Sequence, residues 1–129
     1  MKEVETFQLS KNEERLVELL QKFDYTNGDA KILAYMLNKK KAISKQIERD
    51  MDLRQPEVSI GIKKLRKQGT ITVKTIQTPG KGRPTYEYIL KTNLDDVRKN
   101  MLEWVEGRIA EQVSWLEELD TLFKELIKK

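Results

Sequence analysis

The sequence contains no cysteine and no histidine, and it has only three prolines. Without cysteine the chain forms no disulfide and offers no thiolate to a metal ion or a redox reaction. Without histidine it lacks the commonest metal ligand and the commonest general base. No apolar run approaches the roughly 20 residues that span a bilayer. We therefore expect a cytoplasmic binding protein that uses no metal and no cofactor and does not enter a membrane.

Charge is what the chain has in excess, and it is segregated along the sequence. Charged residues make up 36% of the 129 residues and apolar residues only 38%. The net charge is −3 for residues 1–30, +10 for 31–91 and −3 for 92–129, in agreement with the total of +4. A DNA duplex carries about one negative charge per 1.7 Å of axis, so a basic segment between acidic ones predicts contact with phosphates. The low apolar fraction also favours a chain that buries surface against its own copy.

Hydrophobic spacing predicts a mainly α protein with one small β-hairpin. The expected helices are residues 11–23, a second that follows the turn at 24–29 and stops near Asn38, 44–51, 55–68 and 93–128. We expect Ser44 to cap the third helix and Gly69 to end the fourth. After Gly69 the period changes to two, which predicts a strand over 70–77 and a second strand around Tyr86, Tyr88 and Leu90. The lysines at 39–41 form a basic connector that either contacts phosphate or is simply solvated.

The last helix is long for a chain of this size. Residues 93–128 would reach about 54 Å at 1.5 Å per residue, and their apolar side chains recur about every 3.6 positions. A small domain cannot cover such a length, so we expect a second copy of the chain to pack on it as in a coiled coil. The residues expected in this dimer interface are Val97, Met101, Trp104, Val105, Ile109, Val113, Leu116, Leu119 and Phe123.

Three sequence pieces indicate a known fold. They are Ile43-Ser44-Lys45-Gln46-Ile47, Leu53-Arg54-Gln55-Pro56-Glu57-Val58-Ser59 and Gly80-Lys81-Gly82-Arg83-Pro84-Thr85-Tyr86. Their order, three helices, a tight turn, a helix and a hairpin, resembles the winged helix-turn-helix transcriptional regulators. The dimeric regulators of the MarR/ArsR/TrmB type are the most similar. The resemblance covers residues 27–91 by motif and the terminal helices by architecture only.

The resemblance implies both a domain organisation and a function. It places a winged helix-turn-helix DNA-binding domain at residues 1–91 and a dimerisation helix at 92–129. It implies a homodimeric, sequence-specific regulator of transcription that binds double-stranded DNA, with helix 55–68 in a major groove and the hairpin, or wing, in the minor groove. Many such regulators bind an apolar effector at the dimer interface. Trp104 and Trp115 are open to that role or to plain packing, and any effector is unknown.

The DNA-binding residues follow from the geometry of a helix in the major groove. With Val58 inward, the outward and N-terminal positions are Arg54, Gln55, Ser59, Ile60, Lys63 and Lys67. In the major groove Arg reads guanine, Gln reads adenine, and an apolar side chain contacts the thymine methyl. The wing sequence resembles the core that AT-hook peptides lay in the minor groove, so we expect Lys81 and Arg83 to bind there.

Glu48 and Asp52 depart from the family pattern, which has Ala and Gly at these positions. Aspartate tolerates the left-handed conformation better than most residues, so we expect the turn at Asp52 to form. We hypothesise that Gly61 leaves room for the methylenes of Glu48, whose carboxylate then reaches a nearby Arg or Lys.

Other function classes find less support in the sequence. We find no nucleophile–base pair, phosphate-binding glycine loop or ligand cluster, so we expect no enzyme. Tyr86 and Tyr88 share one strand face and are expected to pack inward, which disfavours an RNA-binding sheet. The alternative is a winged-helix module that binds another protein of the transcription machinery, although such a module needs no segment of net charge +10.

Overall fold

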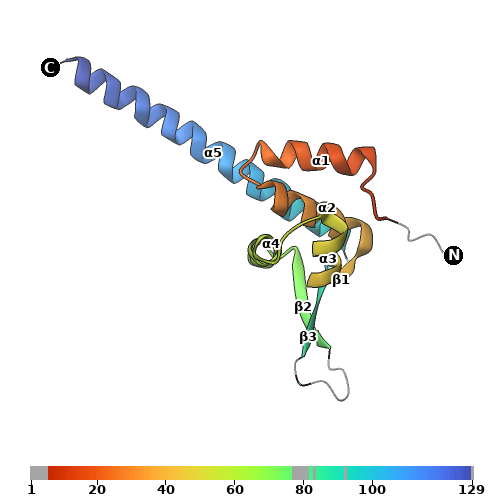
Figure 1. Cartoon of the computed structure of the whole chain (residues 1–129). Coiled ribbons are helices and arrows are strands. Elements are labelled where there is room, and N and C mark those ends of the chain that lie inside the picture. Colours follow the sequence, from red (N-terminus) through yellow and green to blue (C-terminus); the bar gives the residue numbers. More distant parts are fainter. Residues whose placement is uncertain (1–5, 77–81, 83, 92, 129) are drawn as a thin grey trace.

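The computed structural model describes residues 6–76, 82, 84–91 and 93–128. Over these residues it has five helices, α1 (Lys11–Gln21), α2 (Asn27–Lys39), α3 (Ser44–Met51), α4 (Gln55–Lys67) and α5 (Leu94–Ile127). The strands are β1 (Lys41–Ile43), β2 (Ile71–Ile76) and β3 (Thr85–Leu90). Four helices and the sheet form one body, and α5 extends from it as a long arm (Figure 1). The prediction of a mainly α chain with a hairpin and a long last helix is confirmed.

Reciprocal hydrogen bonds fix where the first two helices begin. At α1 the Ser10 hydroxyl accepts from the Glu13 N–H at 3.2 Å, and the Glu13 carboxylate accepts from the Ser10 N–H at 2.8 Å. This backbone hydrogen bond is the largest cause that lowers the pKa of Glu13. Thr26 and Asp29 form the same pair at α2. Each pair satisfies two of the N–H groups that a helix start leaves unpaired.

Ser44 does not cap α3, so that expectation was wrong. Ser44 is the first helical residue, and the cap position belongs to Ile43. The Gln46 side chain accepts from the Ile43 N–H at 2.9 Å, which supplies half of the usual capping pair without a hydroxyl. The polar residue that caps this helix is therefore Gln46, which belongs to the first turn of α3 and does not precede it.

The sheet has a third strand that the sequence analysis took for a connector. Its order is β1-β3-β2, with both pairings antiparallel, and Tyr88 pairs with Ala42 on one side and Val73 on the other. Lys40 adopts a left-handed conformation (φ 72°) that ends α2 and turns the chain onto β3. Three residues are too few to show an alternating pattern, so β1 gave no signal of its own.

The core surrounds α2, which is buried over most of its length. Ile32, Leu33, Tyr35 and Met36 are each at most 1% exposed. The other elements contribute Val17, Leu20, Ile47, Met51, Val58, Ile62, Leu65, Ile71, Leu90 and Val97 to the same cluster. Helix α4 thus rests on α2 through one face and leaves its opposite face to solvent.

Two tight turns hold α4 in place, and both were expected. Asp52 has φ 52° and ψ 52°, and the N–H groups of Asp52 and Leu53 both donate to the Glu48 carbonyl oxygen. At the other end Gly69 has φ 77°, and Thr70 N–H donates back to the Leu65 carbonyl oxygen at 2.9 Å. This is the Schellman ending, in which a left-handed glycine closes a helix.

The hypothesis that linked Gly61 to Glu48 was wrong. A Cβ atom on Gly61 would lie 2.5 Å from Ile32 Cδ1 and 3.3 Å from Asp29 Oδ1, so this glycine faces α2. Glu48 is half-buried and forms no ion pair with any residue that the structure describes. Gly61 serves the close approach of α4 to α2, and nothing in the structure explains Glu48.

Candidate nucleic-acid interface

The outward face of α4 is the most distinctive surface of the body. Val58, Ile62 and Leu65 anchor the helix and are at most 4% exposed. The six residues expected to face outward are all exposed: Arg54, Gln55, Ser59, Ile60, Lys63 and Lys67. Ile60 is 65% exposed, which is unusual for an isoleucine in a folded domain. Arg54 precedes the helix, and its side chain makes no cap hydrogen bond, because a guanidinium has no acceptor for the first N–H groups. Glu57 accepts from the Arg54 backbone N–H at 3.1 Å.

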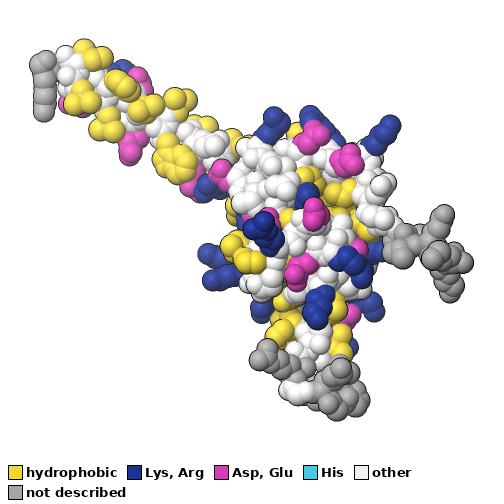
Figure 2. Space-filling model, viewed as in Figure 1, with side chains coloured by type: hydrophobic (Ala, Val, Ile, Leu, Met, Phe, Trp, Pro, Cys, Tyr) yellow, Lys and Arg dark blue, Asp and Glu magenta, His cyan; other side chains and the backbone are white. Residues whose placement is uncertain are grey.

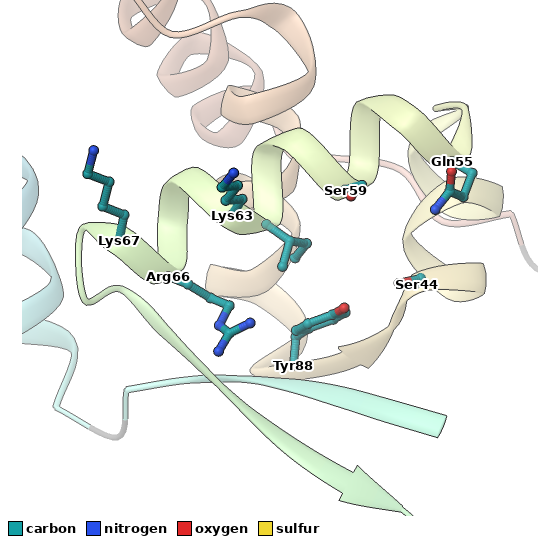
Figure 3. Close-up of a pocket in the computed structure, with 8 residues that line it drawn as sticks. Ser44, Gln55, Ser59, Lys63, Arg66, Lys67 and Tyr88 are labelled. Carbon is teal, nitrogen blue, oxygen red and sulfur yellow. The ribbon is translucent and has the colours of Figure 1, made fainter. Parts of the chain in front are cut away.

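A basic groove separates α4 from the sheet. It is a hollow of about 540 Å³, lined by Ser44, Gln55, Ser59, Ile62, Lys63, Arg66, Lys67 and Tyr88. Figure 3 shows Arg66 extending from α4 toward the strand that carries Tyr88. The groove joins three cations of α4 to the foot of the hairpin, a form suited to an anionic backbone.

Arg66 is a member of this groove that the sequence analysis did not single out. At 100° per residue it lies 80° from Val58 (eight positions on) and therefore on the flank of the helix. Helical spacing does not predict what lies beside a flanking residue, because that depends on where the hairpin packs. Its only sequence signal was membership of the basic run in α4.

The two tyrosines of β3 behave differently. Tyr88 is half-buried against the core, as expected, but Tyr86 is 51% exposed, and the expectation that it packs inward was wrong. Strand β1 pairs only with residues 87–89, so it ends before it reaches Tyr86. Tyr86 instead lines a smaller hollow with Ser44 and Lys45 at the start of α3.

The structure does not test the expected wing contacts. Lys81 and Arg83 fall outside the described residues, and Ile76 and Thr85 form the last described pair of the two strands. Lys39, Lys40 and Lys41 are exposed, but two have local contacts. Lys39 lies 5.0 Å from the centre of the Phe7 ring, and Lys40 Nζ donates to the Leu37 carbonyl oxygen at the end of α2.

Helix α5 divides into a covered part and an uncovered part. Val97 is only 3% exposed and belongs to the chain's own core, with Met101 and Trp104 packed against the same cluster. These three expected interface residues are thus covered without a partner, and Val105 is half-buried. Farther along, the apolar residues are 43–77% exposed: Ile109, Val113, Trp115, Leu116, Leu119, Leu122, Phe123, Leu126 and Ile127. Figure 2 shows hydrophobic side chains gathered along this arm.

No group of three or more acidic, histidine or cysteine side chains that could hold a metal occurs in the part of the chain that the structure describes. Among those residues, no helix is both long and apolar enough to cross a membrane.

No family model and no curated protein matches the sequence, but solved structures match the fold. A possible transcriptional regulator from Methanosarcina mazei Go1 has a TM-score of 0.55 at 17% identity, over 87% of this chain and 86% of its own. This chain has a winged helix-turn-helix fold. In this fold α3 and α4 form the helix-turn-helix, and β2 and β3 form the wing.

Two further structures share the winged helix-turn-helix fold. TrmBL2, an archaeal chromatin protein described with a novel mode of DNA binding, has a TM-score of 0.57 at 20% identity over 88% of this chain. The match spans only 41% of that protein. A protein from the thermoacidophilic archaeon Sulfolobus tokodaii has a TM-score of 0.53 at 21% identity, over 79% of this chain and 93% of its own. The fold expected from the resemblance is confirmed.

Proposed function

We propose that this protein is a transcriptional regulator that binds double-stranded DNA as a homodimer. The observation that carries the proposal is the exposed face of α4, whose cations lie beside a groove that leads to the wing. An α-helix fits the major groove, and its N-terminal residues meet the base edges. A possible transcriptional regulator and a DNA-binding chromatin protein among the structures of similar fold support the same function.

The residues of α4 divide into two roles in this proposal. Arg54, Gln55 and Ile60 lie in the N-terminal half of α4 or just before it, and in this proposal they contact bases. Lys63 and Lys67 lie one and two turns farther on, where ammonium groups meet phosphates rather than bases.

The wing and the residue beside it would bind the DNA between its major and minor grooves. Arg66 lines the groove beside the hairpin, and in this proposal it binds the phosphates between the major and the minor groove. Lys81 and Arg83 at the wing tip would then enter the minor groove, where arginine seeks the negative potential of A·T sequences.

The dimer would form through the uncovered part of α5. Leu102, Ile109, Leu116 and Phe123 recur at every seventh residue, the spacing that places them on one seam between two helices. All four are at least 40% exposed in the single chain. A two-fold axis between the copies would place the two α4 helices in successive major grooves, about 34 Å apart.

Fluorescence anisotropy with a labelled random-sequence duplex, measured over a salt series, tests the function. We expect log K to fall linearly with log salt, with a slope of about −0.9 for each phosphate neutralised. A variant with Lys63→Gln and Lys67→Gln removes four ammonium groups per dimer and should reduce the slope by about 3 to 4.

A variant with Lys11→Gln and Lys22→Gln is the matched control. It makes the same change in net charge on α1 and should leave the slope unchanged. Equal losses in the two variants would show that net charge, rather than the α4 face, drives binding. No binding at low salt would refute the proposal and favour the protein-binding module.

A further inference from the structure

Lys64 lies within the basic run of α4 but points away from the exposed face. Its side chain is 22% exposed, and its ammonium group donates to the Asp29 carboxylate at 3.1 Å and to the Asp24 carbonyl oxygen at 3.0 Å. The Asp29 side chain is only 5% exposed. An ion pair this sheltered is screened much less by salt than a surface pair.

The same ammonium group lies between two aromatic rings. It is 4.0 Å from the centre of the Tyr25 ring and 4.7 Å from that of Trp104. The rings themselves meet edge to face at 4.9 Å. Both distances fall within the range of a cation–π interaction. Because Trp104 belongs to α5, one lysine links the helix proposed to bind DNA to the helix proposed to form the dimer.

A second contact joins α5 to the same place. Arg108, one turn beyond Trp104, donates from Nε to the Asp24 carboxylate at 2.9 Å and also binds it through Nη2. Its guanidinium carbon lies 5.8 Å from the Trp104 ring. We call this group the Lys64 cluster, and it consists of Asp24, Tyr25, Asp29, Lys64, Trp104 and Arg108.

Long side chains such as these hold α5 against the body. No Cα–Cα distance between α5 and another described helix or strand is 8 Å or less. Val97 fixes the first turns of α5 in the core, and the Lys64 cluster contacts it two to three turns farther along. Met101 adds to the hold of Val97 on the core, so the Lys64 cluster is the attachment that lies farthest along α5 among the described residues, and it constrains the angle at which α5 leaves the body.

We propose that Lys64 is a positioning residue that sets the half-site spacing that the dimer recognises on DNA. The inference rests on the proposed function, since it requires that α5 form the dimer and α4 bind the duplex. The part of α5 beyond Trp104 is about 35 Å long, so a change of about 10° in its direction moves its far end by about 6 Å. That displacement corresponds to nearly two base pairs at about 3.4 Å each.

Selection of binding sites from a random-sequence duplex library tests this role. The wild type should select paired half-sites at one spacing. Lys64→Met removes the ammonium group and keeps the aliphatic stem, and it should select the same half-sites at three or more spacings. Lys64→Arg keeps a cation at this position and should, like the wild type, select one spacing.

Two further variants keep the test decisive. Lys63→Met changes the neighbouring lysine on the outward face, and it should weaken binding and keep the single spacing. Arg108→Gln removes the second link through a partly exposed residue, so it tests the cluster even where Lys64→Met does not fold. It should broaden the spacing as well.

The outcomes separate the two proposals. A wild type that selects no paired half-sites refutes the proposed function together with this inference. A wild type with one spacing, which Lys64→Met and Arg108→Gln both retain, refutes the positioning role alone. A change in half-site sequence at constant spacing would also overturn it, because Lys64 would then act on base recognition.

Discussion

Replacement of Gly61 by alanine should destabilise the protein, although alanine is the better helix former. Gly61 lies in the middle of α4, where a glycine weakens an isolated helix by about 1 kcal/mol relative to alanine. In the folded chain, however, the new Cβ would lie 2.5 Å from Ile32 Cδ1. Ile32 is 0% exposed, so a shift of its Cδ1 methyl group must be accommodated within the close-packed core.

The two effects oppose each other, and the steric one is larger. Overpacking of a core costs about 1–3 kcal/mol, because neighbouring side chains leave their preferred rotamers. After the gain in helix propensity is subtracted, a loss of about 0–2 kcal/mol remains. Because the new Cβ would approach Ile32 to 2.5 Å, we expect the upper half of that range, a fall of about 1–2 kcal/mol in the free energy of unfolding. For a chain of this length that corresponds to a Tm about 4–7 °C lower.

Urea unfolding followed by tryptophan fluorescence measures the change. All variants are compared at one protein concentration, because the proposed dimerisation would make apparent stability depend on it. Gly107→Ala in α5 is the matched control, since a Cβ there meets no atom within 4 Å. It should stabilise the protein by about 0.5–1 kcal/mol.

A double-mutant cycle identifies the cause. Ile32→Val removes the Cδ1 atom that the new Cβ would meet, at a cost of about 0.5–1.5 kcal/mol on its own. In the Ile32→Val background, Gly61→Ala should be neutral or stabilising, which gives a coupling energy of about 1–2 kcal/mol. Additive effects, or a Gly61→Ala protein as stable as the wild type, would refute the reasoning.

Two further predictions concern pH and the dimer. Burial favours a raised pKa of Asp50, but hydrogen bonds from Tyr35 and Arg49 outweigh it and lower this pKa, while burial and Asp50 raise the pKa of Tyr35. The stability that Asp50 contributes is therefore fully present above about pH 3.9 and is lost as the pH falls through its folded pKa. The stability that Tyr35 contributes is present below about pH 10 and is lost as the pH rises above that value. Tyr35→Phe should flatten the pH dependence of the urea midpoint at both ends, and an unchanged profile would contradict this. Leu116→Glu should give a folded monomer in analytical ultracentrifugation with weakened DNA binding, whereas Ser114→Glu should remain a dimer; a Leu116→Glu dimer would show that this part of α5 is not the interface.

Local signals determined most of the fold. The left-handed turns at Asp52 and Gly69 follow from the chemistry of single residues, since few residue types tolerate a positive φ. The helical spacing of Val58, Ile62 and Leu65 already divided α4 into a buried and an exposed face. The outward residues of the candidate interface followed from that division, whereas Arg66, on the flank of the helix, could be assigned only once the hairpin was placed beside it.

Other features required contacts between distant parts of the chain. Strand β1 exists because Lys40 turns the chain onto the edge of β3, whose paired residues lie 44 to 48 positions later in the sequence. Tyr86 is exposed two residues beyond Tyr88 along β3, where β1 no longer pairs with that strand. Gly61 is needed where α2 crosses α4, and a helical pattern does not reveal which helix lies opposite.

Lys63 and Lys64 show most clearly where the sequence stops and the tertiary structure decides. The two residues are adjacent and chemically identical, and composition assigns both to the same basic segment. In the folded chain Lys63 faces solvent beside the groove, whereas Lys64 is held by a buried carboxylate and two aromatic rings. The sequence determined that this segment would be a basic helix, because charge and periodicity are local properties. Which lysine remains exposed on α4 depends on partners 35 and 40 residues away along the chain, and only the packing of α2, α4 and α5 brings them together.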